Sequence, residues 1–296
     1  HIEALMLFHS SYTALLTPFK DNHVDFESYR KLIDFQIENG TNGLVPVGTT
    51  GESPTLSHEE HKKLVEVCVE QSNGRVPVIA GAGSNSTSEA VEFVKHASNA
   101  GADGVLVVTP YYNKPTQSGL LAHYNELIKH SSKPIIIYDI PGRSVIQMHD
   151  DTMAKLAENE LIVGVKDATA DLARPTRLQN LISDDFIQLS GEDGTALAYL
   201  AAGGHGCISV TANIAPKLIS EMHNAWRAGD IILCQKINKK LMPLHDALFC
   251  ETSPGPLKYA ASLLGICSQE ARLPIVDIEN TSKKNVKKAL ENIGLL

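Results

Sequence analysis

The sequence lacks the features that mark disulfide-rich, zinc-binding or membrane-spanning proteins. Its five cysteines, Cys68, Cys207, Cys234, Cys250 and Cys267, are scattered and form no CxxC pair, so neither a disulfide framework nor a zinc site is indicated. No apolar run reaches the roughly 20 residues that a helix needs to cross a bilayer. No segment has the pattern of a secretory leader. We therefore expect a cytoplasmic protein that holds no metal.

The chain also has no excess of positive charge. It carries 26 basic and 34 acidic residues, for a net charge of -8, which argues against nucleic acid or an anionic membrane as partner. The lysines at 283, 284, 287 and 288 lie at helical spacing and indicate a solvated helix face. With 296 residues, 43% of them hydrophobic, the chain is long enough to bury a large core.

Short apolar runs alternate with amphipathic segments along most of the chain. Each run is too short for a helix and indicates a buried strand. The eight predicted strands are 12–17, 43–47, 77–80, 104–109, 134–138, 162–166, 186–190 and 206–210. Helical patterns follow them at 26–39, 57–72, 86–100, 118–131, 151–158, 171–183, 194–202 and 215–228. Two of these helices are predicted to open with capping boxes, Ser57 with Glu60 and Ser86 with Glu89.

This alternation predicts an α/β fold, a (β/α)8 TIM barrel with a C-terminal α-helical domain. A doubly wound open sheet is the alternative, but no Gly-x-Gly-x-x-Gly follows the first strand and the even spacing favours closure. Helical patterns at 231–248, 254–265 and 282–292 have no strand between them. We therefore place a barrel domain at 5–229 and a helical domain at 230–296.

Lys166 is the most informative single residue. It closes the apolar run 161–165, so its amine is expected to lie at the end of a buried strand. Burial disfavours the charged ammonium and leaves an amine that can attack a ketone and form a Schiff base. The structural alternative is a lysine whose head group extends to solvent at a strand end.

Further polar residues stand at the carboxyl ends of predicted strands, where barrel enzymes have their active sites. Tyr138 can act as general acid and base, and Thr49 can relay a proton as a hydroxyl. The backbone around Thr49 and Thr50 can hold a carboxylate, and Arg143 can bind a second one. Each has a structural alternative as a turn residue, a packing aromatic or a surface arginine.

Longer motifs, taken together, resemble the dihydrodipicolinate synthase family of pyruvate-dependent class I aldolases. They are GTTGES at 48–53, TPYYNKP at 109–115, YDIPGRS at 138–144, GVKDAT at 164–169, GGHGCISVTANIAP at 203–216, ETSPGPLKYA at 251–260 and ARLP at 271–274. The resemblance therefore covers nearly the whole chain.

The resemblance implies condensation of pyruvate with L-aspartate 4-semialdehyde to 4-hydroxy-tetrahydrodipicolinate, on the route to diaminopimelate and lysine. It implies a pyruvate imine on Lys166, with no separate cofactor, and a proton relay of Tyr138, Thr49 and Tyr112. In the family the tyrosine matching Tyr112 enters the site of the neighbouring subunit. A homotetramer built as a dimer of dimers is therefore expected.

The same match implies substrate-binding and regulatory residues. Thr50 would hold the pyruvate carboxylate, Arg143 the semialdehyde carboxylate, and the carbonyls of Gly191 and Ile208 would lie near the site. Family members from bacteria are often inhibited by lysine. The residues here that match the lysine site are Ser53, Pro54, His58, His61, Asn85, Glu89 and Tyr111.

Four positions depart from the family pattern: Asp139, Ser144, Val145 and Ala170. None removes a catalytic residue, although Asp139 adds a carboxylate beside Tyr138. Two alternative functions stay open. A sister aldolase, such as N-acetylneuraminate lyase or a keto-deoxy sugar-acid aldolase, would share Lys166 and Tyr138 but would not need Arg143. A non-catalytic amino-acid sensor would not need the relay hydroxyls.

Overall fold

The computed structural model describes residues 2–296 and divides them into two compact units. Unit 1 contains the N-terminal helix α1 (Ile2–Leu7) and residues 77–208, and unit 2 contains residues 10–76 and 209–296. The division runs through the strand–helix repeats. The predicted boundary between residues 229 and 230 stays a prediction.

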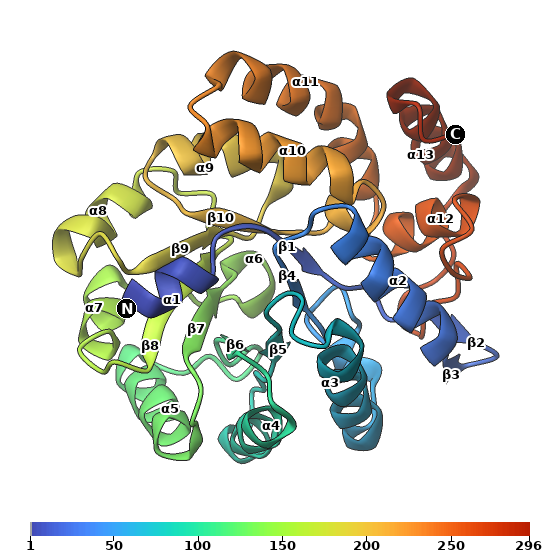
Figure 1. Cartoon of the computed structure of the whole chain (residues 1–296). Coiled ribbons are helices and arrows are strands. Elements are labelled where there is room, and N and C mark those ends of the chain that lie inside the picture. The colour runs from blue at the N-terminus through green and yellow to red at the C-terminus, as the bar shows by residue number, and fades with distance from the viewer. Residues whose placement is uncertain (1) are drawn as a thin grey trace. The chain divides into compact units, whose positions relative to one another are not determined.

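Unit 1 is built on a run of parallel strands in which each neighbour along the chain is also a neighbour in the sheet, in the order β10-β9-β8-β7-β6-β5. These strands are β5 (Ile79–Gly81), β6 (Gly104–Val108), β7 (Ile135–Asp139), β8 (Ile162–Asp167), β9 (Ile187–Ser190) and β10 (Gly206–Ser209). Their helices are α4 (Thr87–Ala100), α5 (Gln117–His130), α6 (Pro141–Ser144), α7 (Asp150–Leu156), α8 (Arg174–Leu181) and α9 (Ala196–Ala201), with the 3-10 turn η2 (Asp193–Thr195) before α9. Figure 1 shows α4, α5, α7 and α8 on the outer side of the strands that precede them.

Unit 2 contains a parallel strand pair and the C-terminal helices. The strands β1 (Ser10–Ala14) and β4 (Gly43–Val45) pair in parallel, with Tyr12 opposite Gly43. The other elements are β2 (Phe19–Lys20), β3 (His23–Val24), α2 (Phe26–Glu38), η1 (Ser53–Thr55), α3 (His58–Ser72), η3 (Thr211–Asn213), α10 (Pro216–Arg227), α11 (Ile231–Leu248), α12 (Gly255–Leu263) and α13 (Asn280–Ile293). In Figure 1, α10 and α11 lie side by side in orange, and α11 and α12 both contact α13.

The predicted fold class is confirmed. Eight parallel strands are present in the described residues, a helix follows each of them, and helices alone follow α10. This is the element order of a (β/α)8 barrel with a C-terminal helical region. The antiparallel ribbon of β2 and β3 was not predicted, because two-residue strands are too short to show a periodic pattern.

Most predicted elements lie within a few residues of those observed, and the differences have local causes. The predicted helix 171–183 begins only at Arg174. Before it, the Thr169 hydroxyl accepts from the amide of Asp171 at 3.2 Å, and the Asp171 carboxylate accepts from the amide of Ala173 at 3.1 Å. These side chains bind the backbone in a turn and so delay the helix.

Of the two predicted capping boxes, one is confirmed and one is wrong. The Ser57 hydroxyl accepts from the amide of Glu60, and the Glu60 carboxylate accepts from the amide of Ser57. At α4, Ser86 makes no such bond. The Glu89 carboxylate accepts instead from the hydroxyl of Ser84 at 2.7 Å, a partner outside the helix that competes with the box.

Apolar side chains fill the interior of both units, as the alternating pattern predicts. The strand residues Ile135, Ile136 and Ile137 of β7 are fully buried, which explains the unbroken apolar run of a parallel strand. Within residues 2–296, none of the helices combines the length and hydropathy needed to span a bilayer.

His123 on α5 is a buried histidine whose pKa lies well below its usual value. It is 4% exposed, and its Nδ1 lies 2.8 Å from the hydroxyl of Thr87 on α4. Its Nε2 has no hydrogen-bond partner among residues 2–296. Burial lowers the pKa of His123 from 6.5 to about 4, so the ring stays neutral in the folded protein at neutral pH.

We predict that His123 makes stability fall as pH is lowered from 7 to 5. Below pH 6.5 the His123 ring binds a proton in the unfolded chain, whereas in the folded chain it does so only near pH 4. The free energy of unfolding therefore falls between these two pH values. The loss at pH 5 is about 2 kcal/mol. Urea unfolding at both pH values should show this extra loss in the native protein compared with His123→Asn. The exposed His149→Asn variant serves as control, and equal losses in all three proteins would contradict the prediction.

Candidate active site

The predicted nucleophile and the predicted acid–base residue lie side by side on neighbouring strands. Tyr138 of β7 is paired in register with Lys166 of β8. The Lys166 Nζ atom lies 4.1 Å from the centroid of the Tyr138 ring, and the two residues are only 5% and 6% exposed. The amine therefore lies over the ring of a phenol, a group that can both donate and accept a proton.

Gly191 leaves room for the Lys166 side chain. It directly follows β9, and its amide donates to the carbonyl of Asp167 at 2.7 Å. A Cβ atom at this position would lie 2.9 Å from the Cβ of Ala168 and 3.3 Å from the Cε of Lys166. Any side chain at position 191 would therefore press against the Cε atom that carries the Lys166 amine. This supports the placement of Gly191 beside the site.

Strand β10 carries two further buried residues, Cys207 and Ile208. The side chain of Ile208, whose carbonyl is predicted to lie near the site, is buried, and that role stays a prediction. The neighbouring Cys207 is buried, and burial, followed by the charge of Asp193, raises the pKa of its thiol well above the usual value. The thiol is therefore protonated at neutral pH and does not compete with the amine as a nucleophile.

Two of the predicted site residues, Tyr112 and Arg143, are exposed in the segments that follow β6 and β7. Tyr112 is 87% exposed and has a positive φ of 75°, a conformation that is uncommon for a bulky residue. The next residue, Asn113, donates from its side chain to the carbonyl of Asn85 at 2.8 Å, which ties this loop to the one before α4. Arg143 is exposed on the short helix α6. Neither Tyr112 nor Arg143 is enclosed within unit 1.

In unit 2, Thr49 and Thr50 lie in a compact turn after β4. The amide of Glu52 donates to the carbonyl of Thr49 at 3.0 Å. The hydroxyl of Thr17 donates to the carbonyl of Gly51 at 2.7 Å. Glu52 itself has a positive φ of 57°. Such a conformation is strained for a residue with a side chain and persists only where the surroundings hold it.

Those surroundings are an ion pair that the sequence analysis missed. The Glu52 carboxylate lies 2.5 Å from the Nζ of Lys258 on α12, and both side chains are buried. Its other oxygen accepts from the amide of Arg272 at 2.9 Å. Lys258 also donates to the carbonyl of Glu270 at 2.7 Å and lies 4.2 Å from the centroid of the Phe19 ring. Lys258 and Arg272 belong to the motifs at 251–260 and 271–274, for which no role was predicted.

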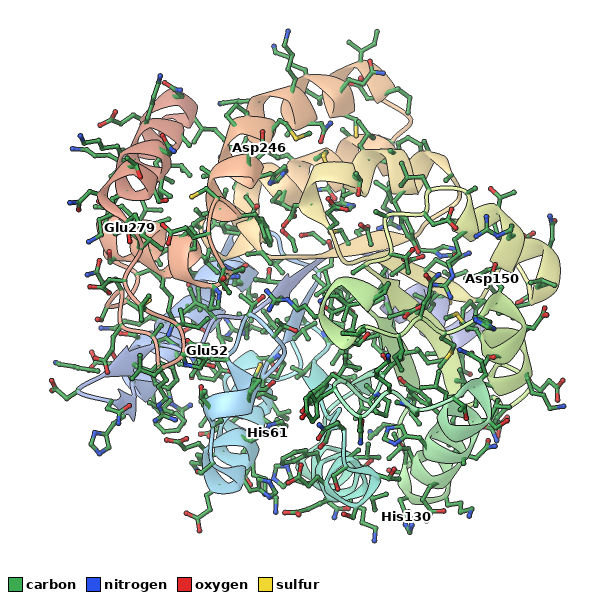
Figure 2. All side chains as sticks on the ribbon, turned by 180° about the vertical axis from the view of Figure 1, so that it is seen from behind. Glu52, His61, His130, Asp150, Asp246 and Glu279 are labelled. Atoms are coloured by element: carbon green, nitrogen blue, oxygen red, sulfur yellow. The ribbon has the colours of Figure 1, made fainter. Side chains whose placement is uncertain are left out.

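The residues predicted for lysine binding are divided between the two units. Asn85, Glu89 and Tyr111 are partly buried in unit 1, where the Glu89 carboxylate already accepts from Ser84. In unit 2, Ser53 is partly buried, Pro54 and His58 are exposed, and His61 is 4% exposed on α3. Figure 2 labels Glu52 and His61 in the blue part of the ribbon.

Comparison with known proteins assigns the family. A family model described as the dihydrodipicolinate synthetase family matches residues 7–293. The chain is 58% identical over 291 residues to the 4-hydroxy-tetrahydrodipicolinate synthase of Acidiphilium cryptum, covering 98% of this chain and 100% of that protein. It is 56% identical over 289 residues to the enzyme of that name from Bradyrhizobium diazoefficiens, covering 98% of both chains.

Solved structures agree with the sequence relatives. Dihydrodipicolinate synthase from Acinetobacter baumannii, a chloride-inhibited enzyme complexed with pyruvate, is 42% identical with a TM-score of 0.94, covering 97% of this chain and 99% of that one. The lysine-bound enzyme from Cyanidioschyzon merolae is 38% identical with a TM-score of 0.95, covering 98% and 99%. These matches span both units and confirm the predicted fold class.

We predict that Lys258→Met destabilises the protein by about 3–5 kcal/mol, because the Glu52 carboxylate would stay buried without its cation. Burial by itself lowers the pKa of Lys258, whereas Glu52 raises it, so each charge depends on the other. Chemical unfolding measures the change. The double variant Glu52→Gln/Lys258→Met should recover part of the loss, and the exposed Lys239→Met is the matched control. A loss below about 1 kcal/mol in the single variant would contradict the role of the pair.

Proposed function

We propose that this chain, which belongs to the dihydrodipicolinate synthetase family, condenses pyruvate with L-aspartate 4-semialdehyde to give 4-hydroxy-tetrahydrodipicolinate. Family membership makes it a lyase of lysine and diaminopimelate biosynthesis. The observation that carries the proposal within the chain is the buried pair of Lys166 and Tyr138, whose amine and phenol ring are in contact.

In the proposed reaction the Lys166 amine attacks the keto carbon of pyruvate. Loss of water gives an imine, with Tyr138 supplying and removing protons at the oxygen and nitrogen. The imine acidifies the neighbouring methyl group, and the resulting enamine carbon adds to the aldehyde carbon of the second substrate. Attack by that substrate's own amino group then releases Lys166 and closes the ring. No separate cofactor is required, because the lysine supplies the covalent group.

The remaining site residues have supporting roles in this proposal. The turn at Thr49 and Thr50 is held rigidly by Glu52, as a turn that grips a carboxylate would need to be. Arg143 is proposed to bind the semialdehyde carboxylate from its helix α6. The 87% exposure of Tyr112 suits a side chain that reaches into a neighbouring subunit, which supports a dimer as the smallest competent assembly. We propose a tetramer built from two such dimers.

We predict that borohydride reduction in the presence of pyruvate attaches one reduced pyruvate to the native protein and none to Lys166→Ala. The variant should also lose condensation activity, since Lys166 is the amine that lies against Tyr138. Intact-mass spectrometry measures the first and a coupled assay the second. Lys155→Ala, which removes an exposed lysine of α7, is the matched control and should behave as the native protein.

The same assay separates the alternatives. Turnover with the semialdehyde alone supports the proposal. Turnover with N-acetylmannosamine or a sugar-acid aldehyde instead would assign the chain to a sister aldolase and remove the role given to Arg143. If the native protein forms no imine and turns over none of these substrates, a sensor function would replace the enzymatic one.

We further propose that L-lysine inhibits the enzyme through a site that contains Glu89, as the matching residues suggest. Millimolar lysine should lower the steady-state rate. Glu89→Gln should raise the inhibitory concentration about tenfold or more, because the carboxylate would no longer pair with the ligand's ammonium group. Glu126→Gln, an exposed glutamate on α5, is the control. Full activity in millimolar lysine would contradict the proposal.

A further inference from the structure

The structure contains a buried charge cluster that the proposed reaction does not use directly. Arg174, the first residue of α8, is completely buried, although arginine is rarely found so. Its Nη1 donates to the carboxylate of Asp139 at 2.7 Å, its Nη2 to the carbonyl of Met148 at 2.7 Å and its Nε to the carboxylate of Asp150 at 2.8 Å. The carboxylate of Asp167 lies 4.0 Å from Nη1. Every nitrogen of the guanidinium therefore has a partner.

Two of these acidic residues are the immediate neighbours of the reacting pair. Asp139 follows Tyr138 at the end of β7, and Asp167 follows Lys166 at the end of β8. The strands pair Tyr138 with Lys166 and Asp139 with Asp167. Because successive side chains of a strand point to opposite faces, one face carries the phenol and the amine while the other carries the two carboxylates. Arg174 binds this second face.

Arg174 also binds Met148, which lies in the segment that follows Arg143. The amide of Met148 donates to the Asp139 carboxylate at 3.3 Å, and the Met148 carbonyl accepts from Arg174. Met148 is fully buried, four residues beyond the end of α6. The segment that carries Arg143 is thus fixed at its far end by the same guanidinium that holds the strand ends.

The cluster is costly to bury and therefore sensitive to the loss of one member. Burial raises the pKa of Asp139, and the charge and hydrogen bond of Arg174 oppose that rise. Burial alone would lower the pKa of Arg174, but Asp139, Asp167 and Asp150 raise it. One oxygen of Asp167 has no hydrogen-bond partner among residues 2–296, so the nearby guanidinium compensates its charge through space.

We propose that Arg174 is a positioning residue that sets the placement of Lys166 and Tyr138 by clamping Asp139 and Asp167 behind them. It touches no reacting atom and acts through the backbone of the two strand ends. A lysine cannot replace it, because one ammonium group cannot span three acceptors that the planar fork of arginine meets together. This inference rests on the proposed Schiff-base function.

A neighbouring arginine provides a matched control. Arg177 lies one turn further along α8 and also binds Asp150, at 2.9 Å, but its second partner is Asp171 on the surface. Figure 2 labels Asp150 among the outer helices of unit 1, and its side chain is 21% exposed. Removing Arg177 therefore disturbs the same helix and the same aspartate without touching the carboxylates behind Tyr138 and Lys166.

The test compares Arg174→Lys, Arg174→Met/Asp139→Asn and Arg177→Met with the native protein. The double variant removes a positive and a negative charge together and so avoids an uncompensated buried carboxylate at position 139. Circular dichroism gives the folded fraction, borohydride trapping with pyruvate gives the rate of imine formation, and steady-state kinetics give kcat and KM.

We expect both Arg174 variants to fold and to form the pyruvate imine more slowly. Their kcat per folded molecule should fall about 100-fold, the order of loss for misplacement by an ångström, while KM for pyruvate changes less than about threefold. Arg177→Met should retain native kinetics.

The inference is overturned if either folded Arg174 variant keeps kcat within about twofold of the native value, or if the whole loss follows the folded fraction. Failure of both variants to fold would assign the cluster a structural role alone and overturn positioning. A native protein that forms no imine would overturn the proposed function, and this inference with it. That outcome is distinct, because it appears before any variant is measured.

Discussion

The in-register pairing of β7 with β8 is the constraint on which the candidate site depends. It places Tyr138 opposite Lys166 and, one residue later, Asp139 opposite Asp167. If either strand shifted by one residue, its member of each pair would move to the other face of the sheet. The amine would then lie beside a carboxylate instead of a phenol. The chemistry of the site is therefore determined by strand register before any loop is considered.

In each unit, the candidate site residues are supported by a buried ion pair that takes no direct part in the proposed reaction. In unit 1, Arg174 holds the carboxylates behind Tyr138 and Lys166. In unit 2, Lys258 holds Glu52 at the base of the turn that carries Thr49 and Thr50. Buried ion pairs add little net stability, since desolvation offsets their attraction, but losing one partner is costly. Such pairs suit sites where a single geometry is needed more than additional stability.

Much of the fold could be predicted from the sequence, because strand and helix periodicity are local signals. The eight apolar runs and the eleven helical patterns correspond to observed elements, and the capping box at Ser57 is present. The box at Ser86 is not, because Glu89 finds a partner in Ser84. The helix at 174 begins late, because side chains at 169 and 171 bind the backbone before it. In both cases a local competing hydrogen bond decided the outcome.

The sequence by itself determined the order of strands and helices, the strand-end position of Lys166 and Tyr138, and the residue types available for Schiff-base chemistry. These follow from the spacing of apolar residues and from motifs contiguous in the chain. Only the tertiary structure revealed that Arg174 binds Asp139 and that Lys258 binds Glu52. The partners are separated by 35 residues in the first pair and by about 200 in the second. No periodic pattern links residues so far apart, because what selects them is the low polarity of the interior, where a buried charge must find its opposite.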